Sequence, residues 1–253
     1  MSSAATLSKL LDQQNVDIAF ITEHKLFQHS KYFMNTVNSM YSNITVCDSN
    51  TEVYGKLRCG KGGVSIMYKN TLEFAIREMA EVTDDRIAGV EIFPNSNTST
   101  RLYVFCVYMP SANYSIDVYL DYLNTLYALY NSYSEVGTVI FLGDMNAERI
   151  HSGKATQSLR DIKFTQFLEN NGLTSLVHLP DCNGPKYSYI TMEKMLDYIV
   201  MPSQDIDMLN SISVLQDDMY HVSDHLPVMA VIRIPITFIN ITNRSMKVAW
   251  HKI

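Results

Sequence analysis

Polar residues suited to phosphate chemistry lie at the ends of four apolar runs. These residues are Glu23, Asp144 with Asn146, Asp197, and Asp224 with His225. Hydrolysis of a phosphodiester needs an activated nucleophile, neutralisation of developing negative charge and help for the leaving oxygen. Carboxylate, amide and imidazole side chains supply these functions, so the set predicts a metal-assisted phosphodiesterase.

The residue types suggest a division of roles. Glu23 offers a carboxylate oxygen, the kind of ligand that Mg²⁺ takes. Asp144 can orient or deprotonate the attacking water, and Asn146 can hold that aspartate or the phosphate. His225, kept charged by Asp197, can donate a hydrogen bond to the phosphate in the transition state.

Each position alone also fits a structural role, such as a surface acid after a strand or a solvated turn. Tyr108 ends the run RLYVFCVYMP and can donate its hydroxyl to a phosphate oxygen, but strand tyrosines more often serve packing. Asp197 is harder to explain structurally, because a charge set against an apolar run is costly unless it is paired. A histidine is a natural partner for it.

Apolar spacing predicts the elements that position these residues. Helical spacing predicts helices over 5–14, 115–130 and 158–173. Strand-length runs predict strands over 16–21, 64–70, 72–79, 86–93, 101–110, 138–144, 196–202 and 225–234. Because strands outnumber helices, and helices separate groups of strands, we predict an α/β sandwich of two mixed sheets with helices outside.

The candidate residues divide by their position on these strands. Glu23, Tyr108 and Asp144 come at carboxyl ends, whereas Asp197, Asp224 and His225 come at amino ends. If the two groups of strands are antiparallel, all six reach the same edge of the sandwich.

Composition limits the class of protein. The 253 residues carry a formal net charge of −6, which gives no support to a basic nucleic-acid coat, although a local patch can still bind DNA. The four cysteines form no C-x-x-C pair and indicate reduced structural thiols. No apolar run approaches the roughly 20 residues of a membrane span, and the N-terminus lacks a signal-peptide core. We therefore expect an intracellular protein with no membrane partner.

One domain is expected over residues 1–235. The segment NRSMKVAWHKI, at 243–253, is basic and is expected to lack a strand partner. Residues 236–253 are accordingly interpreted as a C-terminal tail or the start of a linker.

The segments DIAFITEH, KGGVSIMY, VYMP, FLGDMNA, LDYIV and VSDHLPV, in this order, resemble the endonuclease/exonuclease/phosphatase superfamily. LTSLVHLPDCNGPKYSYITMEKMLDYIVMPS and KVAWHKI are similar to parts of the endonuclease domain of non-LTR (LINE-like) retrotransposons. The resemblance implies a four-layer α/β sandwich and one or two Mg²⁺ ions, with Mn²⁺ as a substitute. It also implies DNA nicking in the nucleus, which leaves a 3′-hydroxyl for a following reverse transcriptase domain.

The resemblance also implies a role for each matching residue. It assigns metal binding to Glu23 and Asp224, catalysis to Tyr108, Asp144, Asn146, Asp197 and His225, and substrate binding to Asn146, Ser188 and Ser223. The family begins with a strand that carries an asparagine, whereas this sequence begins in the helix that would follow it. The first strand is therefore expected to be absent.

Two other functions stay open. One is a superfamily phosphatase or phosphodiesterase that acts on a phosphoinositide or on RNA. The other is a non-catalytic domain that binds nucleic acid or protein, because an element of the fold is expected to be missing. Basic side chains around the motifs would favour nucleic acid, and the candidates are Lys25, Lys61, Arg149 and Lys186.

Overall fold

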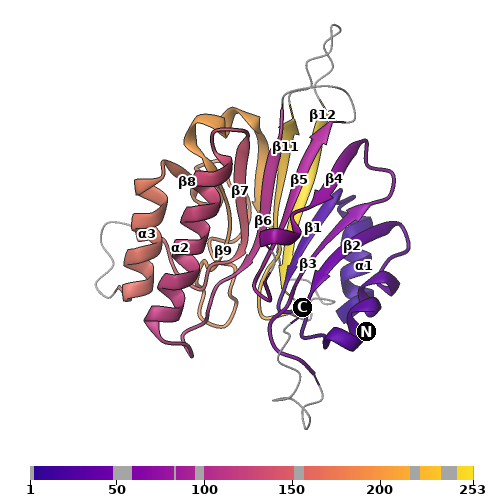
Figure 1. Cartoon of the computed structure of the whole chain (residues 1–253), viewed down its shortest axis with the longest axis horizontal. Helices are drawn as coiled ribbons and strands as arrows, with labels where there is room; N and C mark the ends of the chain where they lie inside the picture. The colour runs from indigo at the N-terminus through magenta and orange to yellow at the C-terminus, as the bar shows by residue number, and fades with distance from the viewer. Residues whose placement is uncertain are drawn as a thin grey trace, which may run out of the picture.

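Two mixed β-sheets of six strands each pack face to face in the computed structural model (Figure 1). The structure describes residues 3–47, 59–82, 84–94, 100–150, 157–216, 223–234 and 244–252. The helices are α1 (Ser3–Gln13), α2 (Ile116–Tyr133) and α3 (Leu159–Asn170), with short 3₁₀ segments η1 (Gln28–Thr36), η3 (Ala80–Val82), η4 (Leu176–His178) and η5 (Ser203–Met208). Helix α1 covers one side of the sandwich, and α2 and α3 cover the other. This confirms the predicted four-layer architecture.

The first sheet has the strand order β10-β11-β12-β1-β3-β2. Its strands are β1 (Ile18–Thr22), β2 (Tyr41–Val46), β3 (Val64–Lys69), β10 (Leu209–Val214), β11 (Val228–Ile234) and β12 (Arg244–Lys252). Strands β1 and β12 are parallel, and the other neighbours are antiparallel.

The second sheet has the order β4-β5-β6-β7-β9-β8. Its strands are β4 (Phe74–Glu78), β5 (Ile87–Pro94), β6 (Leu102–Tyr108), β7 (Thr138–Asp144), β8 (Leu173–Ser175) and β9 (Asp197–Pro202). Strands β6 and β7 are parallel, and the other neighbours are antiparallel.

Strand β1 shows why the sequence forms layers. Ile18 and Phe20 pack in the core between the sheets, whereas Ala19 and Ile21 pack in a second core beneath α1. Alternate residues of a strand point to opposite faces, so a strand covered on both sides must be apolar throughout. This is why β1 is buried along its whole length, and it ends at Thr22, just before the first charged residue, Glu23.

The sequence predicted the three helices and the long buried strands, but it missed the short or half-exposed strands β2, β8 and β10. Strand β2 is buried only at Tyr41, and β8 has three residues. Strand β10 has exposed or partly exposed residues at most positions. Such segments carry little hydrophobic periodicity, because one face or one end meets solvent.

The prediction that residues 243–253 lack a strand partner is wrong. Strand β12 lies between β1 and β11, and its backbone pairs from Ile18–Val248 to Thr22–Lys252 with β1 (Figure 1). Met246 and Val248 are buried in the core between the sheets. Among the described residues no strand precedes α1, and the parallel neighbour of β1 is β12. The local sequence does not predict this pairing, because β1 lies at the other end of the chain.

Candidate active site

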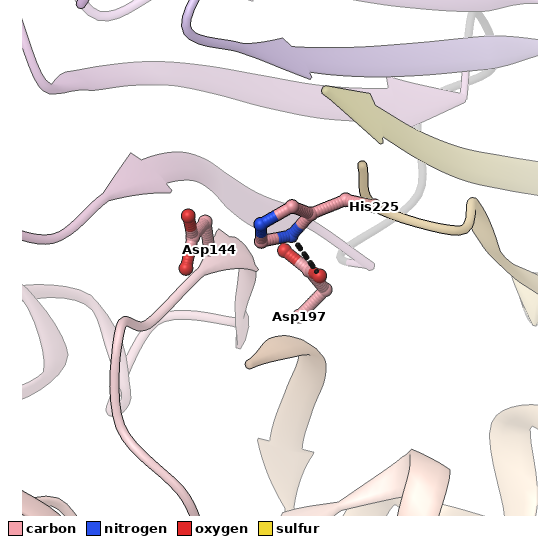
Figure 2. Close-up of side chains that lie close together, drawn as sticks. All are labelled: Asp144, Asp197 and His225. Atoms are coloured by element: carbon pink, nitrogen blue, oxygen red, sulfur yellow. Dashed lines mark hydrogen bonds and ion pairs between the residues drawn. The ribbon is translucent and has the colours of Figure 1, made fainter. Parts of the chain in front are cut away.

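Asp144, Asp197 and His225 form a buried group, here called the acidic–histidine cluster. The two aspartates are Cα partners at the end of the antiparallel β7–β9 pair, and both are 0% exposed. His225 Nδ1 lies 2.6 Å from Asp197 Oδ2. One possible ligand atom from each residue lies within 4.8 Å of the others, and Figure 2 shows the far edge of the His225 ring facing Asp144. With a proton on Nδ1, the imidazole donates a hydrogen bond to a carboxylate that would otherwise be costly to bury.

A glycine turn sets the position of Asp144. Gly143 has φ 134°, and a Cβ there would lie 2.1 Å from the carbonyl oxygen of Val107 on the neighbouring strand. The N–H of Asn146 donates to Asp144 Oδ1 at 2.9 Å, and its side-chain amide donates to the Met109 carbonyl at 2.8 Å. Asn146 therefore holds Asp144 through its backbone, while its side chain fixes the loop that follows β6.

Ser188 holds the backbone that carries Asp197. Its side chain is fully buried, and its Oγ accepts hydrogen bonds from the N–H groups of Leu196 and Asp197, both at 3.0 Å. The Ser188 carbonyl accepts from the N–H of Leu226 at 2.7 Å, which ties this segment to the chain that carries His225. Ser188 was predicted to bind substrate; in the structure, these bonds hold the backbone next to Asp197 and His225 in place.

His225 is 2% exposed and is held on both sides. Its backbone N–H donates to Ser223 Oγ at 3.1 Å, and the ring of Tyr189 lies 4.9 Å from the imidazole. Asp224 is exposed, and its carbonyl accepts from the N–H of Ile190. The segment therefore turns so that the histidine points inward and the neighbouring aspartate outward.

Glu23 and Tyr108 form the second part of the site. The Tyr108 hydroxyl donates to Glu23 Oε1 at 2.9 Å. Burial, followed by the charges of Glu23 and Asp144, raises the pKa of Tyr108, so the phenol stays a neutral donor. Tyr108 is the Cα partner of Asp144 across the parallel β6–β7 pair. It therefore links Glu23 to the acidic–histidine cluster.

The backbone around Glu23 is turned sharply. Glu23 has φ 58°, and its N–H donates to the Gly63 carbonyl at 2.7 Å. The next residue, His24, is buried, bonds the Val46 carbonyl through Nε2 at 2.9 Å, and accepts from the Leu26 N–H through Nδ1 at 3.1 Å. Burial lowers the pKa of His24. A neutral imidazole with its proton on Nε2 satisfies both bonds and fixes the turn.

Two buried arginines hold the loop after β6, and the sequence analysis missed both. Arg86 lies 4.9 Å from the Tyr108 ring and 4.7 Å from the Tyr114 ring, and it donates to the Tyr108 carbonyl. Arg160 on α3 donates to the carbonyls of Pro110 at 2.6 Å and of Tyr114. A cation facing aromatic rings is stabilised by their quadrupoles. Neither arginine belongs to a recognisable sequence motif, so only the three-dimensional contacts reveal this role.

A cavity of about 540 Å³ opens beside the acidic–histidine cluster. Asn146, Asp224 and His225 line it, together with the loop residues Ser111 and Asn113. We call it the active-site cavity. It gives a substrate access to a histidine that is itself almost completely buried.

The structure thus brings the predicted residues to one edge, as expected from their positions on the strands. Asp144, Asp197 and His225 converge in one group, and Glu23 joins through Tyr108. Glu23 and Asp224, the two predicted metal ligands, are not part of the acidic–histidine cluster. The side chain of Glu23 is 18% exposed, and its carboxylate is chemically suited to Mg²⁺ or Mn²⁺.

The fold and the site define an α/β sandwich of the endonuclease/exonuclease/phosphatase superfamily. Residues 102–229, half of the chain, match the family model described as endonuclease-reverse transcriptase. The chain belongs to this family. No curated protein matches the sequence.

Solved structures of the superfamily share the fold. The endonuclease domain of TRAS1, a telomere-specific non-LTR retrotransposon, is 16% identical with a TM-score of 0.65, over 88% of both chains. An AP endonuclease from Archaeoglobus fulgidus is 15% identical with a TM-score of 0.63, over 89% of this chain and 92% of that one. The 3′ phosphatase NExo from Neisseria, bound to a product DNA hairpin, is 17% identical with a TM-score of 0.59, over 88% and 91%. No helix among the described residues is long and apolar enough to cross a membrane.

Proposed function

We propose that this protein is a divalent-metal-dependent DNA endonuclease that nicks target DNA for retrotransposition. The observation that carries the proposal is the buried Asp197–His225 pair beside Asp144, at the edge where Glu23 also lies. An acid–imidazole pair next to a second carboxylate is a set of groups that can activate water and stabilise a phosphoryl oxygen.

In this proposal Asp144 orients or deprotonates the attacking water. Asn146 keeps that carboxylate in place through its N–H, at 2.9 Å. Its side chain lines the cavity, where it can also contact the substrate. Because Asp144 is fully buried, its charge acts in a region of low dielectric, where electrostatic effects are strong.

His225 supplies a hydrogen bond to a phosphoryl oxygen, and Asp197 fixes its orientation and favours its protonated form. Ser188 supports this pair by holding the backbone of Asp197. Tyr108 donates from its neutral phenol, either to Glu23 or to the phosphate. Ser223 accepts the hydrogen bond that stabilises the turn before His225, and a contact with the substrate is part of the proposal.

Glu23 is the proposed main ligand of Mg²⁺ or Mn²⁺, and Asp224 is the proposed second carboxylate. When bound, such an ion acts as a Lewis acid on the phosphate. The accessible carboxylate of Glu23 and its hydrogen bond to Tyr108 support this assignment, because metal-binding carboxylates are usually oriented by a hydrogen-bond donor.

The DNA substrate, a nuclear location and a following reverse transcriptase domain are parts of the same proposal. The family of the chain supports them, since its description names both an endonuclease and a reverse transcriptase. A phosphatase with a small substrate is the rival activity.

Supercoiled plasmid tests the proposal. We expect the wild-type chain to convert it to the nicked form with Mg²⁺, and to lose this activity with EDTA. Asp144→Ala and His225→Ala should both be inactive. Hydrolysis of an inositol phosphate or of a 3′-phosphate, with the plasmid left intact, would overturn the endonuclease and favour the phosphatase.

A further inference from the structure

Three residues form a row along one wall of the active-site cavity. Tyr189 makes one antiparallel backbone bridge with Lys194 and another with His225, so it lies between them. Residues that face each other across such a bridge have their side chains on the same side. All three line the cavity, and the Tyr189 ring lies 4.9 Å from the His225 ring. Lys194 therefore faces the same space as the histidine, one chain segment further along the wall.

The backbone of Lys194 is fixed by this pairing. Its N–H donates to the Tyr189 carbonyl at 3.2 Å, and its carbonyl accepts from the N–H groups of Tyr189 at 2.8 Å and Ser188 at 3.0 Å. Paired segments lie roughly 4.8 Å apart, so the backbones of Lys194 and His225 are roughly 10 Å apart. Side chains that project in parallel at this spacing suit two neighbouring phosphates better than one.

The ion pair that Lys194 makes is of a kind that a substrate can replace. Lys194 Nζ lies 3.8 Å from Glu148 Oε2. A charge-assisted hydrogen bond is shorter, at roughly 2.7–2.9 Å. The side chain of Lys194 is 41% exposed and that of Glu148 is 18% exposed. Because long, partly exposed ion pairs stabilise a fold very little, a phosphate that enters the cavity can displace Glu148.

The other charges of the cavity leave Lys194 as the cation available to a substrate. Among the described residues that line it, the basic side chains besides His225 are Arg160 and Lys194. Arg160 is buried and donates to two backbone carbonyls of the loop after β6. Glu148 and Asp224 also line the cavity, and their carboxylates repel a phosphate. A cation that can leave its carboxylate offsets this repulsion.

We infer that Lys194 binds the phosphate next to the scissile one in a polynucleotide strand, and that Glu148 holds Lys194 until this phosphate arrives. His225 serves the scissile phosphate, and Lys194, further along the row, binds its neighbour. A small diester with a single phosphate has no such neighbour, so Lys194 favours internal phosphodiesters of a strand. The inference rests on the proposed endonuclease function and assigns this preference to one residue.

The test compares Lys194 variants on two substrates. One is a fluorescently labelled DNA duplex that is nicked in Mg²⁺, and the other is bis(p-nitrophenyl) phosphate, a diester with a single phosphate. Lys194→Ala should raise KM for the duplex about tenfold with kcat nearly unchanged, and should lower the slope of log KM against log salt by about one. Hydrolysis of the small diester should fall by less than about twofold, because Lys194 contacts only the second phosphate. Lys194→Arg keeps the charge and should restore most of the affinity for the duplex.

Glu148→Gln distinguishes a substrate-binding lysine from a structural ion pair. If Glu148 holds Lys194 away from phosphate, this variant should lower KM for the duplex by about threefold, and it should bring no gain in the Lys194→Ala background. Loss of a merely structural pair would raise KM in both single variants. The control is Lys31→Ala, an exposed lysine of η1 that does not line the cavity and should change KM little.

Three results would overturn the inference: changes of KM in the same direction for Lys194→Ala and Glu148→Gln, an unchanged KM in Lys194→Ala, or equal losses on the duplex and the small diester. A wild-type chain that nicks the duplex but gives one of these results keeps the endonuclease function and loses only the role of Lys194. A wild-type chain that never nicks DNA loses the proposed function and the inference together.

Discussion

The two parts of the candidate site are built in different ways. The acidic–histidine cluster is buried, and its two aspartates face each other because β7 and β9 are paired in register. Glu23 lies beyond the end of β1, on a sharply turned backbone, with its side chain 18% exposed and 3.9 Å from the exposed Lys25. The first part depends on the packing of a whole sheet, and the second on one turn. We therefore expect substitutions in the cluster to abolish most of the activity, and substitutions around Glu23 to reduce it only in part.

The largest expected effect is on the rate of nicking when the cluster is altered. Asp144→Asn and His225→Ala should each lower the rate by roughly a thousandfold, because in the proposed mechanism each removes a group that acts directly on water or phosphate. Plasmid nicking measures this, with circular dichroism to check the fold. Asp121→Asn, on the exposed side of α2, is the control and should keep full activity. Variants of the cluster that retain more than a tenth of the wild-type rate would contradict the assignment.

The second expected effect is on stability. Gly143→Ala should lower the free energy of unfolding by roughly 3 kcal/mol or more, because the φ of 134° and the Val107 carbonyl at 2.1 Å leave no room for a Cβ. Gly172→Ala is the matched control, with φ 59° and no heavy atom within 4 Å of the added Cβ. It should cost about 1 kcal/mol from backbone strain alone. Urea denaturation compares the two, and equal losses would mean that the close approach of β6 and β7 does not fix Asp144.

The third effect should be graded. Tyr108→Phe removes the hydroxyl that bonds Glu23 but keeps the ring that packs on Arg86. We expect a loss of about 10- to 100-fold, expressed partly as a higher Mg²⁺ concentration for half-maximal nicking, because donors that orient metal ligands have effects of this size. A metal titration of the nicking rate measures it. An unchanged metal requirement would separate Tyr108 from Glu23.

The smallest effect concerns pH and the turn at Glu23. Burial lowers the pKa of His24 below its ordinary value of 6.5, so the unfolded chain takes up a proton before the folded chain does. The free energy of unfolding should fall as the pH drops below about 6.5, and this contribution should level off below the pKa of the folded state. His24→Gln should remove that part of the pH dependence. Thermal unfolding between pH 7.5 and 5 measures this contribution. Identical pH profiles for the two proteins would contradict it, because they would show that the pKa of His24 is the same in the folded and unfolded states.

The sequence alone predicted much of the cluster. Asp144, Asp197 and His225 were found because polar side chains of matching chemistry interrupt strongly apolar runs, and such positions place charges at the edge of a sheet. What the sequence could not predict is the register of β7 and β9, which makes Asp144 and Asp197 partners. A short turn between two strands would fix their register, but α3, β8 and η4 lie between β7 and β9 in the chain, so no local turn shows which residues face each other.

The central strand β12 and the loop contacts of Arg86 show the same limit. Strand β12 pairs with β1 across more than two hundred residues of sequence, so its partner could not be deduced from its neighbours. Arg86 gains its role from tyrosines on β6, on the following loop and on α2. Local apolar spacing predicted the strands that are buried on both faces, whereas contacts that depend on the assembled sheets required the structure.

The most direct test of the central claim is a double-mutant cycle on the Asp197–His225 pair. The nicking rate is measured for the wild type, Asp197→Asn, His225→Ala and the double variant, each checked for folding. If Asp197 acts through His225, the double variant should be no slower than His225→Ala alone. Multiplicative losses, in which the double variant loses the product of the two single effects, would show that the residues act independently and would contradict the account.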